Sequence, residues 1–410
     1  MASEIADDLD LRKKLQKSER KKKLEAIGLI TPLLIVMLVF FFVPIALMLY
    51  RSIDNSQMAD ALPKTALAIQ AWNGEGLPNE TVYAAIVEDM RIAQKEKTLA
   101  KVGRRLNFDL VGYHSLLSKS GRKIDNFTQA PYKEQLIAFD KKWGNPEYWV
   151  VMERGLKSIT SIYLLAAADL KYNEKNEIVK VPEYEAIYVS IIARTVYISL
   201  SITILCLVLG FPVAYFMATS PPRIRNLLMI MLLLVFWTSL LVRTLSWILV
   251  LQNQGVVNGI LMSMGIINEP LDLVFNRIGV YIAMTHVLLP FMVLPLYSVM
   301  ASIPPTYMKA ARSLGAKPFA AFWKVYVPQT LPGIGAGALM VFIQALGYYI
   351  TPALVGGPRD QMISYFVAFF VNERVNWSMA SALGVTLLIL TGSLYLIFGK
   401  RVNIANMKLG

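Results

Sequence analysis

The sequence predicts an all-α integral membrane protein with six membrane-spanning helices and a helical insert outside the membrane. Of its 410 residues, 55% are hydrophobic and only 17% are charged, whereas soluble domains carry charge on roughly a quarter of their residues. The apolar residues fall in blocks long enough to cross a hydrocarbon core of ~30 Å, which takes about 20 helical residues. The basic residues between these blocks gather in alternate connections, as in multi-pass membrane proteins.

Six apolar blocks are the expected spans. Each should be helical, because backbone polar groups in lipid have to be satisfied within the segment. The first block has no ionisable side chain and no small-residue cleavage site after it, so it is expected to be a retained helix rather than a removed signal peptide. The approximate bounds of the spans are 28–50, 187–217, 226–251, 277–300, 327–352 and 379–399.

The basic residues predict the orientation of the chain. They gather in the tail 1–27, in the connections after the second and fourth spans, and after the last span, where residues 401–410 form a second tail. This distribution underlies the net charge of +13 and places both termini in the cytoplasm of a bacterial cell, with the spans in its inner membrane. RNA or lipid binding is the alternative role of the N-terminal tail.

The segment 51–186 is then a periplasmic insert. It is close to neutral, with 18 basic and 18 acidic residues between positions 52 and 185. Residues 81–100 and 132–142 have helical periodicity. The apolar run 159–168 is only about half as long as a span, so it is expected to be the core of a small helical domain.

The connection between the fourth and fifth spans, residues 303–328, has the features of a docking element. Thr306 can cap a short helix over 307–314, and Gly315 allows the left-handed turn that ends this helix. A second short helix is expected over 318–326, after which Pro328 restarts the chain into the membrane. Two small alanines in the first helix would let it seat closely against another protein. An ordinary amphipathic connector is the alternative.

This loop resembles the EAA loop of binding-protein-dependent ABC importer permeases. The family pattern is Glu-Ala-Ala, three residues, Gly, nine residues, an aliphatic residue, any residue, an aliphatic residue and Pro. The chain matches it except at Lys309, which stands where the family has Glu. Residues 235–244 and 354–357 resemble motifs of the spermidine/putrescine permeases. The loop residues that the resemblance assigns to ATPase coupling are Lys309, Ala310, Ala311, Gly315, Ala316, Phe322, Val325 and Pro328.

The resemblance implies a type I ABC importer fold and a set of partners. Residues 187–400 would form a five-helix permease core that pairs with a second permease subunit, binds two ATPase subunits and receives a small solute from a periplasmic binding protein. The implied solute is a polyamine or a related organic cation such as putrescine or spermidine. The chain has no glycine-rich phosphate-binding loop, so it is not expected to be an enzyme, and the ATPase would bind ATP and Mg²⁺.

Ionisable and aromatic residues in or beside the spans are the candidates for the solute pathway. Trp237 and Thr244 are seven residues apart and would share nearly one helix face. Aromatic rings and carboxylates would suit a cation, yet no Asp or Glu lies inside an expected span. Helix packing, interfacial anchoring and solvated loops are the alternative roles. The candidates are Trp237, Thr238, Arg243, Thr244, Trp247, Tyr348, Tyr349, Asp360 and Glu373.

Other classes of site and function find little support. The sequence has one cysteine and two distant histidines, so no metal site is expected. No catalytic site is expected either. Membrane lipid is an expected partner, and nucleic acid is not. An amino-acid derivative, an opine or an iron chelate is the alternative solute. An ion-coupled secondary transporter would need intramembrane carboxylates and an inverted repeat, and neither is found in the sequence. A membrane-anchored sensor or scaffold acting through the insert is the third alternative.

Overall fold

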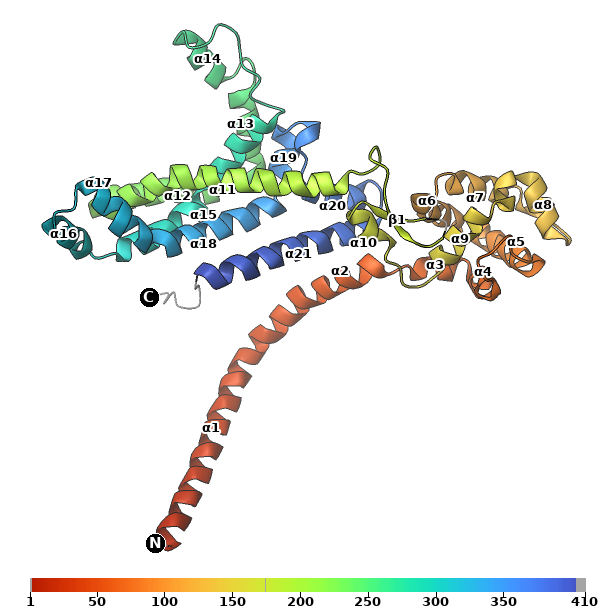
Figure 1. The fold of residues 1–410 in the computed structure, drawn as a ribbon, viewed down its shortest axis with the longest axis horizontal. Coiled ribbons are helices and arrows are strands. Elements are labelled where there is room, and N and C mark those ends of the chain that lie inside the picture. Colours follow the sequence, from red (N-terminus) through yellow and green to blue (C-terminus); the bar gives the residue numbers. More distant parts are fainter. Residues whose placement is uncertain (1, 174, 403–410) are drawn as a thin grey trace. The chain divides into compact units, whose positions relative to one another are not determined.

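The computed structural model describes residues 2–173 and 175–402, and the side chains of 18–173 and 175–396. This part of the chain is helical apart from one two-stranded hairpin and the connections (Figure 1). Six of its helical segments are long and apolar enough to cross a membrane, which confirms the predicted fold class. Residues 403–410 of the expected C-terminal tail lie outside the described residues. The segments are Ser18–Ile53, Tyr188–Thr219, Leu240–Ser263, Arg277–Ser302, Pro318–Gly347 and Trp377–Leu396.

The chain divides into two compact units at Arg51, and the first is one long helical segment. Helix α1 (Ala2–Met37) passes through a π-helical turn (Leu38–Phe42) into α2 (Val43–Ile53). The wide turn lies just before Pro44. A proline ring in an α-helix clashes with the carbonyl four residues earlier, and a π-helical turn relieves that crowding.

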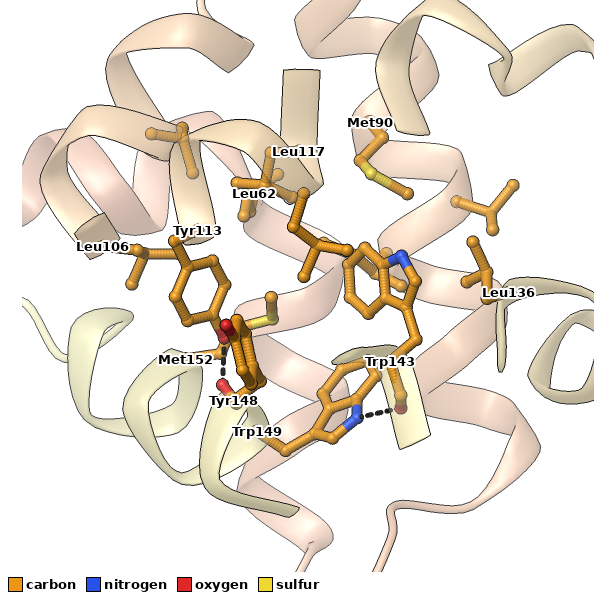
Figure 2. Packing of buried hydrophobic residues seen from close by; sticks show 14 of the residues in the cluster. Leu62, Met90, Leu106, Tyr113, Leu117, Leu136, Trp143, Tyr148, Trp149 and Met152 are labelled. Carbon is orange, nitrogen blue, oxygen red and sulfur yellow. Dashed lines mark hydrogen bonds between the residues drawn. The ribbon is translucent and has the colours of Figure 1, made fainter. Parts of the chain in front are cut away.

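The insert folds around its own hydrophobic core. The Trp143 and Trp149 rings are fully buried with their centroids 5.4 Å apart. Trp149 Nε1 donates to the Trp143 carbonyl at 3.0 Å (Figure 2). Tyr83 Oη donates to the same carbonyl at 2.6 Å. The helices around this core are α3 (Ser56–Ala61), α4 (Pro63–Ala68), α5 (Glu80–Lys95), α6 (Leu99–Asp109), α7 (Tyr113–Arg122), α8 (Tyr132–Phe139) and α9 (Pro146–Gly155), with short 3₁₀ turns at Ile69–Ala71, Ile124–Asn126 and Lys141–Gly144.

The apolar run 159–168 does not form the core of the insert, so that prediction is wrong. Its helix α10 (Ile162–Ala167) buries Tyr163 and Ala167 against residues of the membrane core, among them Ile191 and Met379. The run is short and apolar because it covers the ends of longer helices. A hairpin that the sequence analysis missed follows, in which β1 (Leu170–Tyr172) pairs antiparallel with β2 (Ile178–Lys180) and Lys171 lies opposite Val179.

Asp169 joins this hairpin to the first helix of the membrane core. Its carboxylate accepts hydrogen bonds from the backbone N–H groups of Ile187, Tyr188 and Val189 at 3.1, 2.9 and 2.7 Å. The first N–H groups of a helix have no partner within the helix. A carboxylate there also interacts favourably with the helix dipole. Asp169 therefore fixes where α11 (Tyr188–Thr219) begins.

Helices α11, α15 (Arg277–Ser302) and α18 (Val327–Gly347) lie side by side and form the centre of the membrane core (Figure 1). Helix α21 (Trp377–Val402) packs against α18 and α20 (Ile363–Asn372). Gly337 of α18 faces Met292 of α15, where a Cβ would lie 2.8 Å from Met292 Sδ and 3.0 Å from its carbonyl oxygen. Small residues let membrane helices approach this closely.

The third span was predicted as one helix over 226–251, and this is wrong. Helix α12 (Pro222–Trp237) ends before Thr238, and α13 (Leu240–Leu251) begins after Ser239, with both intervening residues extended. The Thr238 hydroxyl donates to the Val235 carbonyl at 3.1 Å. Such local bonds compete with the helical ladder. A further helix, α14 (Val256–Ser263), follows α13.

The fifth span also differs from its predicted bounds of 327–352. It starts earlier, because α17 (Pro318–Ala321) and a π-helical turn (Phe322–Tyr326) run directly into α18. Pro328 therefore lies in the first turn of α18 and does not restart the chain. The span ends at Gly347, and α19 (Ile350–Val355) is a separate helix followed by a 3₁₀ turn at Pro358–Asp360. Pro352 disfavours a continuous helix, because its ring would clash with the carbonyl of Tyr348.

Candidate functional site

The loop that resembles the EAA motif is a short helix closed by a left-handed glycine. Helix α16 (Thr306–Ser313) precedes Gly315, whose φ is +89° as predicted. Gly315 N donates to the Arg312 carbonyl at 3.0 Å, and Ala316 N donates to the Ala311 carbonyl at 3.1 Å. This pair of bonds is a Schellman motif. Thr306 is the first residue of the helix and makes no capping bond, so the predicted cap is wrong.

The loop presents apolar side chains to its surroundings. Leu314 is 89% exposed, Phe319 is 76% exposed and Trp323 is 55% exposed. Lys309 and Ala310 are exposed beside them, whereas Ala311, Ala316 and Val325 are half-buried. Exposed apolar groups rimmed by polar ones are typical of a protein interaction site.

Phe322 attaches this loop to the membrane core. Its ring packs edge-on against Phe211 and Tyr215 of α11, with centroids 6.2 and 5.4 Å away, and stacks on Tyr326 at 5.6 Å. Tyr326 is buried in the core formed by α11, α15 and α18. These aromatic contacts, worth roughly 0.5–1.5 kcal/mol each beyond burial, hold the π-helical turn that follows α17 against α11.

Arg243 is the one charged group of α13, and its Nε is buried without a hydrogen-bond partner among the described residues. One helical turn further on, Trp247 Nε1 donates to His286 Nδ1 of α15 at 3.3 Å. An imidazolium has no acceptor nitrogen, so this bond requires a neutral His286. The structure thus brings Trp247 of the predicted pathway to His286, one helical turn from Arg243, and these three residues are called the Arg243 cluster. Tyr348 packs against the core formed by α11, α15 and α18.

Thr244 lies on the buried side of the same helix. Its hydroxyl is 3.2 Å from the hydroxyl of Thr351 in α19, and both side chains are buried. Trp237 does not share this face, because the break at Thr238 separates it from Thr244 and leaves its side chain 80% exposed. The prediction that Trp237 and Thr244 lie on one helix face is wrong.

The two candidate carboxylates have different environments. Asp360 is buried and accepts from Arg277 Nε at 2.9 Å and from the Gly357 N–H at 3.3 Å, so the solvated-loop alternative is wrong for this residue. Glu373 is exposed at the C-terminal end of α20. Nearby, Arg194 Nη1 donates to the Arg359 carbonyl at 2.8 Å.

Sequence reasoning missed the aromatic residues of α20. The ring centroids of Tyr349 and Tyr365 are 6.3 Å apart, and Tyr365 stacks on Phe369 with a centroid distance of 6.4 Å. Arg374 Cζ lies 5.3 Å from the centroid of the Phe369 ring. The run Tyr365 to Phe370 contains four aromatic residues, and that density was the available signal. Thr351 and Arg277 were also missed, because their partners are distant in sequence. Among the described residues no group of three His, Cys, Asp or Glu side chains could hold a metal ion.

Comparison with known proteins agrees with this architecture. Residues 210–404 match the family model described as binding-protein-dependent transport system inner membrane component. The spermidine/putrescine transport system permease protein PotB of Salmonella typhimurium is 35% identical over 225 residues, which is 55% of this chain and 78% of that protein. PotB of Escherichia coli K12 is 34% identical, over 55% of this chain and 82% of that protein.

Two further similarities are weaker. The inner membrane ABC transporter permease protein YdcU of Escherichia coli is 32% identical, over 52% of this chain and 71% of that protein. A bacterial ABC transporter involved in alginate import gives a TM-score of 0.40 at 17% identity, covering 53% of this chain and 80% of that one. The identity to the spermidine/putrescine permeases over most of their length decides the family. This chain belongs to the binding-protein-dependent transport system inner membrane components, and it is a multi-pass inner-membrane permease subunit of an ABC importer.

Proposed function

We propose that this permease imports a polyamine or a related organic cation, and that α16 with Gly315 docks on a separate ATPase. The observation that carries the coupling role is the exposed α16–Gly315 turn, attached to α11 through Phe322. The relatives named as spermidine/putrescine permeases support the solute class. In the proposed complex a second permease subunit completes the pathway, two ATPase subunits bind ATP and Mg²⁺, and a binding protein delivers the solute.

A substitution at Gly315 tests the coupling role. An L-residue in the left-handed region costs roughly 1–2 kcal/mol, so Gly315→Val should distort the turn and lower ATP-driven uptake of labelled spermidine in proteoliposomes at least tenfold. Gly259→Val is the matched control, because Gly259 lies in α14 with nothing within 4 Å of a Cβ. Unchanged uptake and unchanged ATPase co-purification for Gly315→Val would refute the docking role.

The same proposal places both termini and the α16 loop in the cytoplasm. Cys206 is the only cysteine and is buried, so one introduced thiol can be labelled selectively. Phe319→Cys should react with a membrane-impermeant maleimide only after the membrane is opened. Val111→Cys is the control, since Val111 is 82% exposed in the insert and should react in intact spheroplasts. Labelling of Phe319→Cys from outside would invert the topology.

A carboxylate-bearing solute, such as an amino-acid derivative, is the second candidate. The Arg243 cluster favours it, because a guanidinium can pair with a carboxylate. Helices α11–α15 and α18 contain no Asp or Glu that could bind a cation, and Asp360 is already paired with Arg277. The two candidates differ in competition. Putrescine should compete with labelled spermidine for uptake if the first holds, whereas only carboxylated solutes would be transported if the second holds.

A further inference from the structure

The insert carries a strongly basic face on the hairpin of α6 and α7 and on the end of α5 that leads into it. Seven Lys and Arg side chains between positions 95 and 123 are exposed, against one exposed acid, Glu96. Within the described part of the chain none of the seven is in an ion pair. They are Lys95, Lys97, Lys101, Arg104, Lys119, Arg122 and Lys123.

Helix packing brings these residues together. α6 and α7 are joined by three residues, and the backbone of His114 fits against Gly103, where a Cβ would lie 3.2 Å from the His114 Cα. Positions 101 and 104 share one side of α6, and Lys97 lies in the turn just before this helix. The Leu99 side chain packs against Gly121, which places the C-terminal turn of α7 beside the start of α6. The basic residues of both helices therefore lie on the exposed sides of one packed hairpin.

This concentration of charge is not a property of the insert as a whole. The segment 52–185 is neutral, with 18 basic and 18 acidic residues, whereas the only exposed acids between positions 95 and 125 are Glu96 and Asp125. Basic residues that set topology lie on the cytoplasmic side. In the proposed topology the insert is periplasmic, so the topology rule gives no reason for this face.

Apart from Arg104, in the middle of α6, the basic face lies towards the end of α6 that is far from the membrane core. The C-terminal end of α6 contacts α10, where Phe108 and Tyr163 have ring centroids 5.5 Å apart. A helix of 11 residues is about 16 Å long, roughly two Debye lengths at physiological salt. A lipid surface near α10 would be largely screened from Lys97 and Arg122, which favours a soluble partner over anionic lipid.

We infer that the α6–α7 basic face is a docking surface for an acidic patch on a soluble protein. The partner that the proposed function supplies is the solute-binding protein, and the inference rests on that function. Exposed unpaired charges raise the rate of encounter with an oppositely charged partner more than they strengthen the final complex. A permease that must capture and release its binding protein in every cycle needs fast, reversible association.

Charge reversal on the basic face tests this. The purified complex in zwitterionic nanodiscs would be titrated with its solute-binding protein by surface plasmon resonance at 50 and 300 mM salt. Lys101→Glu with Arg122→Glu should lower the association rate about tenfold at low salt and flatten its salt dependence. Lys141→Glu with Lys180→Glu changes the net charge by the same amount at exposed sites outside the face. This control should leave the association rate and its salt dependence unchanged. Lys97→Glu with Lys119→Glu should repeat the first result.

The outcomes separate the two proposals. If the binding protein does not associate with the wild-type complex, the proposed function fails. If it associates and all variants behave like the wild type, only the docking surface is refuted. A loss of binding to phosphatidylglycerol vesicles by Lys101→Glu with Arg122→Glu, without loss of binding-protein association, would overturn the inference in favour of lipid.

Discussion

The hydroxyl groups of Thr244 and Thr351 connect α13, which follows the break in the third span, to α19, the short helix after the fifth span. Thr244 and Thr351 are both buried, and their hydroxyl oxygens are 3.2 Å apart. Thr244 also donates to the Leu240 carbonyl at 2.9 Å. The Thr351 hydroxyl therefore relies more on this contact for its hydrogen bond than the Thr244 hydroxyl does. Hydrogen bonds between membrane helices contribute about 0.6 kcal/mol on average. This pair links α13 to α19 beside the Arg243 cluster.

Thr244→Val and Thr351→Val should each lower the free energy of unfolding by roughly 0.5–1 kcal/mol. The double variant should lose less than the sum, because both single changes remove the same bond. Thermal unfolding in detergent measures the effect, and Ser246→Val on the exposed side of α13 is the control. Strict additivity of the two changes would show that the hydroxyls do not interact.

The buried carboxylate of Asp109, in α6 of the insert, makes the stability of the insert depend on pH. Burial raises the pKa of Asp109 above its ordinary value, although Arg105 Nη1 lies 3.6 Å from its Oδ2 and lowers it. The folded state then binds more protons than the unfolded state between the ordinary pKa of about 3.9 and the raised one. Stability therefore rises as pH falls through this window.

Asp109→Asn should remove this dependence. The variant is expected to gain stability relative to the wild type at pH 7 and to lose that advantage as the wild-type carboxyl becomes protonated. The difference in hydrogen-exchange protection of α6 between wild type and variant, taken at matched pH from 7 down to 4.5, measures it. A difference that stays constant, or grows towards acid pH, contradicts the expected direction.

At the scale of helices, prolines and glycines decide where elements break or approach. Both π-helical turns lie just before a proline, Pro44 and Pro328, whose rings would otherwise clash with a carbonyl four residues back. The helix continues through each site in spite of the proline. Gly337 acts differently, by letting α18 touch the backbone of α15 at Met292.

Gly337→Leu should separate α15 from α18 and lower the free energy of unfolding by about 1–3 kcal/mol, the usual cost of overpacking. Gly347→Leu is the matched control on the same helix, because nothing lies within 4 Å of a Cβ there. Thermal unfolding of the purified protein and its yield from membranes measure the change. Equal effects of the two substitutions would show that the close approach at Gly337 is unimportant.

The helical spans could be predicted from sequence, but their breaks could not. Hydropathy and charge located the six spans because lipid imposes their length and composition. The break at Thr238 lies inside an apolar block and is accompanied by a local hydroxyl bond to the Val235 carbonyl, and hydropathy registers neither feature. The burial of Asp360 depends on Arg277, 83 residues away, and a partner that distant leaves no local pattern. The left-handed turn at Gly315 was predictable because its cause is local.

At the scale of the whole chain, the insert is attached to the core through neighbouring ends. Asn55 N donates to the Ser158 carbonyl at 2.9 Å, and Asp54 pairs with Ile159 in an isolated antiparallel bridge. The core of the insert consists of residues from Met58 to Leu156. Adjacent ends and a separate core are the features of a domain that folds independently.

Excision of the insert should leave a membrane core that still folds. Replacing residues 56–157 with two glycines would join ends that are already close, so the shortened chain should insert in the membrane and co-purify with its ATPase. It should lose the dependence of uptake on binding-protein concentration, if the insert captures that protein.

The excised segment 54–159 should unfold cooperatively in urea, as measured by the fluorescence of the buried Trp143 and Trp149. Trp143→Phe with the rest intact is the control that assigns the signal. A shortened chain that fails to reach the membrane, together with an unfolded excised segment, would show that core and insert are one cooperative unit.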